Sequence, residues 1–125
     1  MYDSPKDLLK KILGRKGESL AVKHLQKKGC KILCRNYRTP FGEADIIAES
    51  KTDQGDYLIF IEVKTRTSDL YGRPAIAVNQ KKREKYKKIA AYYCKEKGLE
   101  LFETHIRFDV VEVLPEGITH TEGAF

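Results

Sequence analysis

The stretch YLIFIEVKTRT, residues 57–67, is an apolar run that carries two opposite charges near its middle. Side chains alternate across a β-strand, so Glu62 and Lys64 share one face with Phe60. Both faces begin apolar, which is typical of a central strand, and the two charges emerge at its C-terminal end. An unpaired buried charge is costly, so the pair needs partners at this strand end, where α/β sheets place ligand sites.

The sequence around this strand predicts one three-layer α/β domain over residues 1–125, with a central mixed β-sheet flanked by helices. The expected elements are a helix from Ser4-Pro5 to Gly29, strands over 30–37, 44–50 and 57–64, a helix from Asn79 to about Lys97 and a strand over 105–114. The order is αβββαβ, and because the last strand follows a helical crossover, we expect it to lie parallel to an earlier strand.

Two details of this prediction are less regular. Gly14 and Gly17 fall inside the first helical pattern, where they break the helix or merely weaken it. Residues 115–125, PEGITHTEGAF, are expected to form a weakly structured tail.

Length and composition limit the possible classes of protein. A chain of 125 residues is long enough for one core. Its net charge of +6 and pI of about 9.2 favour a polyanionic partner, either nucleic acid or an anionic membrane surface. No apolar stretch reaches transmembrane length and no signal-peptide pattern is present, so we expect a cytoplasmic protein. Cys30, Cys34 and Cys94 lack metal-ligand spacing and are expected to be small, buried or half-buried hydrophobic residues.

Asp45, in the segment GEADII, begins the strand that precedes 57–64. An antiparallel hairpin places the start of one strand beside the end of the next, so Asp45 is expected to lie near Glu62 and Lys64. Two carboxylates beside a lysine are oxygen ligands suited to Mg²⁺ or Mn²⁺. Such an ion activates water for phosphodiester hydrolysis, and a lysine orients the water or offsets transition-state charge.

Other acids of the sequence have weaker patterns. Glu18 projects from the buried face of the first helix and either shares the metal or is a helix N-terminal acid stabilised by the helix dipole. Glu43 is expected near the surface or behind the ligands, and Asp109 in a structural ion pair. Glu49 and Lys51 repeat the Glu-x-Lys pattern in a polar turn, where a solvated surface pair is expected.

Basic residues suggest contacts with phosphate. The helix that begins near Asn79 carries Lys81 and Lys82 on a face rich in lysine and poor in acids, which is either a solvated face or a phosphate-binding one. Arg73 lies in the preceding loop, where it forms a turn or contacts a nucleic-acid backbone.

Much of the chain resembles a known family. The runs GRKGESLAVKHLQKKGCKILCRNYRTPFGEADIIAE, LIFIEVKTRTSDLYGRPAIAVNQKKREKYKKIAAYYC and RFDVVEV are similar to the YraN-like proteins. That family resembles the restriction-endonuclease-like PD-(D/E)xK superfamily and, within it, the archaeal Holliday junction resolvases. The resemblance covers roughly residues 14–113 and implies the core order αβββαβ.

The resemblance also implies roles for individual residues. The metal-binding acid of the superfamily corresponds to Asp45, its Glu-x-Lys pair to Glu62 and Lys64, the helix acid of the resolvase-like branch to Glu18, and a ligating backbone carbonyl to Val63. Ala44 stands where the motif has proline. Gln80 and Tyr86 have the wrong spacing for the Gln-x-x-x-Tyr element of some exonuclease branches, which argues against an exonuclease-type mechanism.

Together these observations predict a Mg²⁺- or Mn²⁺-dependent endonuclease that hydrolyses DNA, with branched or damaged DNA as candidate substrates. The residues expected to contact phosphates are Arg66, Arg73, Lys81 and Lys82. One active site per chain suggests a homodimer for cutting two strands. A catalytically inactive nucleic-acid-binding module with the same fold is the alternative, and an RNA nuclease is a third reading.

Overall fold

The computed structural model describes residues 5–66 and 80–125, with side chains described from residue 13 onward. Its elements are α1 (Pro5–Lys27), β1 (Lys31–Thr39), β2 (Gly42–Thr52), β3 (Gly55–Thr65), α2 (Gln80–Lys97), the short 3₁₀ helix η1 (Leu101–Glu103), β4 (Ile106–Leu114) and β5 (Gly117–Thr121). The predicted order αβββαβ is confirmed, with β5 added at its end. Ser4, Arg73 and Asn79 lie outside the described residues.

The five strands form one mixed sheet in the order β1-β2-β3-β4-β5. Neighbouring strands are antiparallel except β3 and β4, which are parallel. The parallel pair is the one joined through α2, as expected when a helical crossover links two strands of one sheet. The predicted mixed sheet is therefore confirmed.

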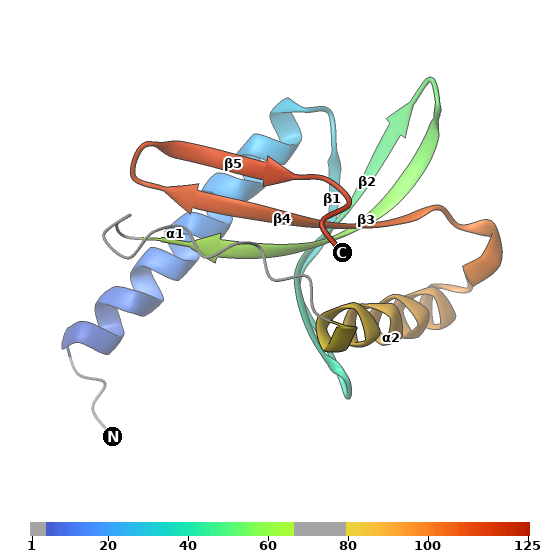
Figure 1. Ribbon diagram of the computed structural model, residues 1–125, viewed down its shortest axis with the longest axis horizontal. Coiled ribbons are helices and arrows are strands. Elements are labelled where there is room, and N and C mark those ends of the chain that lie inside the picture. The colour runs from blue at the N-terminus through green and yellow to red at the C-terminus, as the bar shows by residue number, and fades with distance from the viewer. Residues whose placement is uncertain (1–4, 67–79) are drawn as a thin grey trace.

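Helices α1 and α2 cover opposite faces of the sheet, which gives the predicted three layers (Figure 1). Ala21 and Leu25 of α1 pack on one face with Ile59 and Ile61. The core on the other face contains these residues of α2 and the sheet: Ala44, Ile47, Leu58, Phe60, Tyr86, Ile89, Ala90, Tyr93 and Cys94. Alternate residues of β3 thus enter different cores, as the apolar start of both its faces predicts.

The first helix continues through both of its glycines. Gly14 is exposed, and a Cβ there would meet no atom within 4 Å. Gly17 is buried, and a Cβ there would overlap Thr65 Oγ1 at the end of β3. Gly17 therefore allows close approach of α1 to β3, and tertiary packing compensates for its weak helix propensity.

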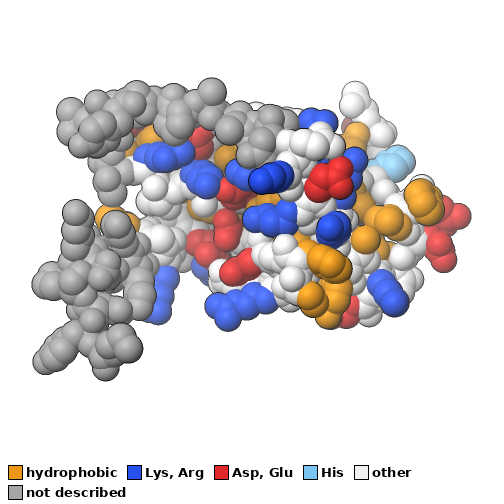
Figure 2. Space-filling view, turned by 60° about the horizontal axis from the view of Figure 1, so that its bottom comes forward, with side chains coloured by type: hydrophobic (Ala, Val, Ile, Leu, Met, Phe, Trp, Pro, Cys, Tyr) orange, Lys and Arg blue, Asp and Glu red, His pale blue; other side chains and the backbone are white. Residues whose placement is uncertain are grey.

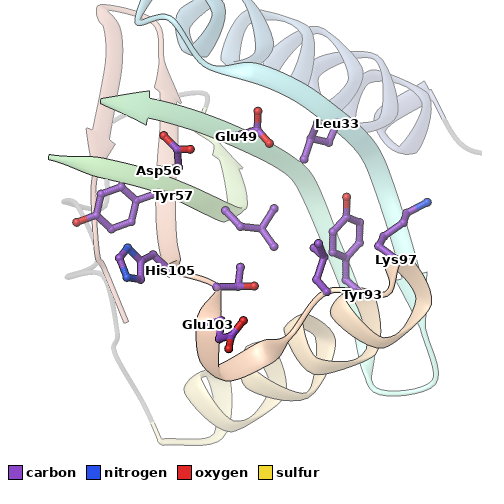
Figure 3. A pocket seen from close by; sticks show the side chains of 11 residues that line it. Leu33, Glu49, Asp56, Tyr57, Tyr93, Lys97, Glu103 and His105 are labelled. Atoms are coloured by element: carbon purple, nitrogen blue, oxygen red, sulfur yellow. The ribbon is translucent and has the colours of Figure 1, made fainter. Parts of the chain in front are cut away.

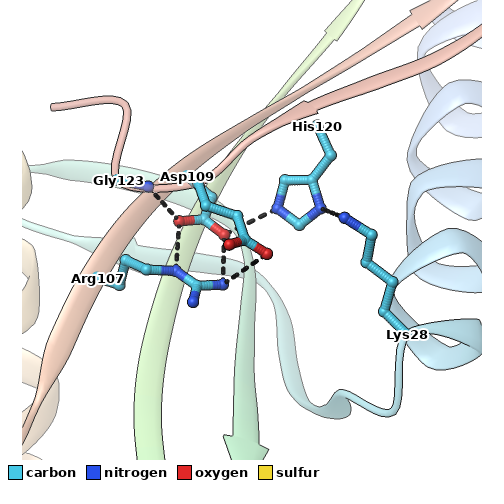
Figure 4. A network of polar contacts seen from close by, with 6 residues as sticks. Lys28, Arg107, Asp109, His120 and Gly123 are labelled. Carbon is cyan, nitrogen blue, oxygen red and sulfur yellow. Dashed lines mark hydrogen bonds and ion pairs between the residues drawn. The ribbon is translucent and has the colours of Figure 1, made fainter. Parts of the chain in front are cut away.

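The weakly structured tail expected over 115–125 is wrong in part, because Gly117–Thr121 forms β5 against β4. The strand is held by Asp109, a fully buried carboxylate that contacts His120 Nε2 at 2.8 Å and accepts a hydrogen bond from the Gly123 N–H at 3.0 Å. Arg107 donates two further bonds to Asp109, at 2.9 and 3.0 Å (Figure 4). The predicted structural ion pair of Asp109 is confirmed.

The cysteines are free thiols; Cys30 and Cys94 are buried and Cys34 is half-buried. Burial raises the pKa of the Cys30 and Cys94 thiols, so they are weak nucleophiles that act as small hydrophobic residues. In the part of the chain that the structure describes, no helix is long and apolar enough to cross a membrane.

Candidate functional site

A gap opens between β2 and β3 where their hairpin ends. The ladder between the two strands stops at the pair Ile46 and Ile61. Beyond that pair, the start of β2 remains bonded to β1 and the end of β3 remains bonded to β4. Asp45 and Glu62 are the next residues on either side, so the hairpin places Asp45 beside Glu62, as predicted, at a point where the two strands separate, which was not predicted.

The carboxylate of Asp45 bridges this gap. Its Oδ2 accepts a 2.7 Å hydrogen bond from the backbone N–H of Val63 on β3. In a strand, N–H and C=O of one residue point to the same side, and successive residues alternate. Arg66 is three residues after Val63, so the two residues point their N–H and C=O groups to opposite sides. The N–H of Arg66 bonds to Val113 on β4, and the carbonyl of Val63 is therefore directed toward β2 and Asp45.

The surroundings of Asp45 are strongly negative. Burial raises its pKa, and the carboxylates of Glu18, Glu62 and Glu43 raise it further, although the hydrogen bond from Val63 acts in the opposite direction. Glu18 lies on α1 and Glu43 on β2, so acids from three elements converge on one carboxylate. Such a field favours either a proton or a cation at Asp45.

Glu62 is held by two lysines. Its Oε1 lies 2.7 Å from Lys64 Nζ and its Oε2 lies 2.7 Å from Lys82 Nζ, while only 13% of its side chain is exposed. Burial alone would raise the pKa of Glu62, but the hydrogen bonds and charges of the two lysines outweigh it and lower the pKa. Glu62 is therefore ionised, and at least one lysine must move before both of its oxygens become available to another cation.

Glu18 reaches the site because Gly17 lets α1 approach the end of β3 closely. Its Oε1 accepts hydrogen bonds from Arg35 Nε at 3.2 Å and Asn36 Nδ2 at 3.0 Å. Asn36 has a positive φ of 54°, a conformation that asparagine tolerates better than most residues. Glu18 therefore has partners on β1 and is not a helix N-terminal acid, since α1 begins at Pro5.

These acids do not form a preassembled metal cage. Among the described residues, no three His, Cys, Asp or Glu side chains are grouped closely enough to hold a metal ion. The structure brings Asp45 and Glu62 together with the Val63 backbone. Glu18 is instead hydrogen-bonded to Arg35 and Asn36.

The basic residues around the gap differ in their environments. Lys82, in the first turn of α2, is engaged with Glu62, whereas Lys81 is exposed. Arg66 is partly buried, and within residues 5–66 and 80–125 its Nε has no hydrogen-bond partner. On the face shown in Figure 2, acidic side chains gather near the centre with lysine and arginine side chains around them.

For two residues, the sequence did not predict a position near the site. Tyr86 of α2 is buried, and after burial itself the charges of Glu62 and Asp45 are the main causes that raise its pKa. Glu112 of β4 is buried and is paired with Lys64 in the parallel ladder. An acid inside the apolar run VVEVL was a sequence signal that Glu112 is buried. Its position beside Lys64, however, depends on a parallel register that the sequence does not reveal.

A concave region lies at the turn end of the β2–β3 hairpin, away from the gap, and contains none of the predicted site residues (Figure 3). Its volume is about 540 Å³. Tyr57 and Tyr93 form part of its wall, and Glu49, Asp56 and Glu103 lie on it. Glu49 Oε1 lies 3.9 Å from Lys51 Nζ. Lys51 is exposed as predicted, but Glu49 is half-buried, and both residues belong to β2 rather than to a turn.

Comparison with known proteins identifies relatives over most of the chain. Residues 17–113 match the model of a family described as "Uncharacterised protein family UPF0102". A UPF0102 protein of Thermodesulfovibrio yellowstonii is 46% identical over 113 residues, which cover 90% of this chain and 95% of the relative. A UPF0102 protein of Clostridioides difficile is 45% identical over 111 residues, or 87% of this chain and 92% of the relative.

Among solved structures, the chain is similar to Pyrococcus furiosus SfsA in complex with Ca²⁺. The sequence identity is 18% and the TM-score 0.31, over 90% of this chain and 63% of that one. A likeness of this size supports no conclusion about function.

Proposed function

The chain belongs to the UPF0102 family, and we propose that it is a metal-dependent nuclease of the restriction-endonuclease-like superfamily that hydrolyses phosphodiester bonds of DNA. The observation that supports this proposal is the Asp45 carboxylate, which lies in the gap between β2 and β3, bonded to the Val63 N–H. Beside it stands Glu62, with Lys64 two residues further along the same strand.

The residues at the gap fit a hard divalent cation. Asp45 and Glu62 offer carboxylate oxygens and Val63 offers a carbonyl directed to the same side, all of them hard oxygen ligands. Mg²⁺ commonly binds through one or two carboxylates and keeps several waters, so a three-acid cage is not required. The negative field that raises the pKa of Asp45 also favours such an ion.

We assign Mg²⁺ or Mn²⁺ to Asp45, Glu62 and Val63. When bound, the ion would lower the pKa of a coordinated water and neutralise charge on the scissile phosphate. Lys64 projects from the same face as Glu62 and supplies positive charge to the phosphate or orients the attacking water. Glu18 faces Asp45 while bonded to Arg35, so it would complete the site from behind the ligands rather than as a ligand in this arrangement.

The surroundings of the gap suit a polyanion. Lys81 and Lys82 at the start of α2, with Arg66 and Arg73 after β3, would contact phosphates on either side of the cleaved bond. The net charge of +6 supports the same assignment. A homodimer would supply the second site needed to cut both strands, and branched or damaged DNA remains the candidate substrate.

A second candidate function is a nucleic-acid-binding module without catalysis. It is favoured by one observation, the pairing of both Glu62 oxygens with lysines at 2.7 Å. In such a module the ion pairs would be purely structural and would persist in the presence of metal.

Cleavage of labelled duplex, single-stranded and four-way-junction DNA with Mg²⁺ or Mn²⁺ separates the two functions. We expect Glu62→Gln to reduce the cleavage rate about 100-fold or more, the usual size for losing one group that stabilises transition-state charge. Glu49→Gln is the matched control, since it alters the other Glu-x-Lys pair, and it should leave the rate unchanged. The nuclease proposal fails if neither metal supports cleavage or if Glu62→Gln cuts as fast as the wild type. Salt-sensitive binding that persists in EDTA would then support the module.

A further inference from the structure

Glu112 is a buried acid on β4 that the proposed mechanism does not yet use. Only 6% of the residue is exposed, and its Oε2 is buried with no hydrogen-bond partner among the residues that the structure describes. Buried carboxylates are nearly always paired, because an unpaired one loses hydration and gains nothing in return. A buried acid that lacks such a bond in one arrangement is expected to gain a partner in another.

Lys64 is the cation best placed to become that partner. Lys64 and Glu112 are directly paired in the parallel ladder between β3 and β4. Paired residues on neighbouring strands point to the same face, about 5 Å apart, which is within reach of a lysine side chain. In this structure the ammonium lies instead 2.7 Å from Glu62 Oε1, and 43% of the lysine side chain is exposed, so space is available for a rotamer change.

The charges around Glu62 show why such a change would occur. Two ammonium groups contact Glu62, one on each oxygen, so at least one of them must withdraw when a divalent cation takes the carboxylate, because the ammonium and the cation repel each other. Lys82 lies on α2 and can turn toward a phosphate at the protein surface. Lys64 lies on the sheet, where Glu112 offers the adjacent carboxylate.

We infer that Glu112 is a positioning residue that receives the ammonium of Lys64 when Glu62 turns to a divalent cation. The inference rests on the proposed function, because it concerns the same site. One carboxylate is exchanged for another, so Lys64 keeps its charge and its place at the edge of the gap. Glu112 thereby lowers the cost of releasing Glu62 and holds Lys64 where a phosphate would bind.

A double-mutant cycle on Mn²⁺ affinity tests this role without DNA or turnover. Isothermal titration calorimetry would compare the wild type, Glu112→Gln, Lys64→Met and the double variant. We expect Glu112→Gln to weaken Mn²⁺ binding about tenfold when Lys64 is present, a size usual for directly coupled charges, and to change it less than about twofold when Lys64 is methionine. Equal effects in both backgrounds, or no effect in either, would overturn the inference, since a merely structural Glu112 acts regardless of Lys64.

A second measurement on the wild type covers the case in which Glu112→Gln does not fold. In a crystal structure with Mn²⁺ bound, Lys64 Nζ should lie within hydrogen-bond distance of Glu112, and an ammonium still on Glu62 would overturn the inference. Asp45→Asn keeps the two proposals distinct. If the wild type binds no Mn²⁺, both proposals fail, whereas Mn²⁺ binding that Asp45→Asn abolishes, without coupling between Lys64 and Glu112, refutes only the role of Glu112.

Discussion

Replacing Gly17 with alanine tests the contact that brings α1, and with it Glu18, to the end of β3. A Cβ at Gly17 would overlap Thr65 Oγ1 and would lie 3.1 Å from Thr65 Cβ and 3.2 Å from Cγ2. Rotating the threonine side chain can move Oγ1 away, but Thr65 Cβ stays 3.1 Å from the added atom, so a tight contact remains. Either the helix moves away from the strand or the contact is strained.

The size of the effect follows from two opposing contributions. Forcing an extra methyl group into a packed contact costs about 1–3 kcal/mol. Alanine in a helix interior gains about 0.5–1 kcal/mol over glycine. Gly14→Ala is the matched control, because it lies in the same helix with no atom within 4 Å of the added Cβ. The free energy of unfolding should therefore be lower for Gly17→Ala than for Gly14→Ala by about 1–3 kcal/mol.

Urea denaturation followed by circular dichroism measures this difference, provided that the m-values agree. Adding Thr65→Ala to Gly17→Ala removes Oγ1 and Cγ2, so the double variant should recover part of the loss, beyond the sum of the single effects. If Gly17→Ala is as stable as Gly14→Ala, the close contact between α1 and β3 does not exist, and the position assigned to Glu18 fails with it.

Three further predictions concern charge. Asp109→Asn should lower the free energy of unfolding by about 3–5 kcal/mol at pH 7, because it leaves the Arg107 charge without its buried partner. Burial would raise the Asp109 pKa, but its hydrogen bonds lower it, so the loss measured by urea denaturation should shrink as the pH falls below about 4. A loss that does not shrink would mean that the ion pair is absent. Asp45→Asn should raise the free energy of unfolding at pH 7 by about 1 kcal/mol. Burial and neighbouring acids raise the pKa of this carboxyl group, so its charged form destabilises the fold. The gain should vanish at low pH, and a loss of stability at neutral pH would contradict the prediction. Lys81→Gln should weaken DNA binding and lower the slope of log affinity against log salt by about 1, and an unchanged slope in a fluorescence-anisotropy titration would exclude its phosphate contact.

The sequence predicted the parts of the fold that depend on local patterns. Alternation in β3 and the hairpin before it place Asp45 opposite Glu62, because a short turn fixes an antiparallel register. The same reasoning could not find the link between Lys64 and Glu112, which depends on the parallel register of strands separated by a helical crossover.

Other features depend on tertiary contacts. Gly17 weakens a helix by local propensity, and its use becomes visible only when Thr65 lies against it. The segment GITHT is short and polar, and it forms β5 because His120 and the nearby Gly123 bond to the buried Asp109. Nothing in the sequence shows that both oxygens of Glu62 are held by lysines, since Lys82 comes from a helix 20 residues later.

The central claim is tested most directly by anomalous diffraction from crystals of the wild-type protein soaked in Mn²⁺. The account predicts an anomalous peak between the carboxylates of Asp45 and Glu62, in contact with the carbonyl of Val63, with Lys64 withdrawn from Glu62. If the gap shows no peak at millimolar Mn²⁺ and both lysines still hold Glu62, the proposed metal site is contradicted.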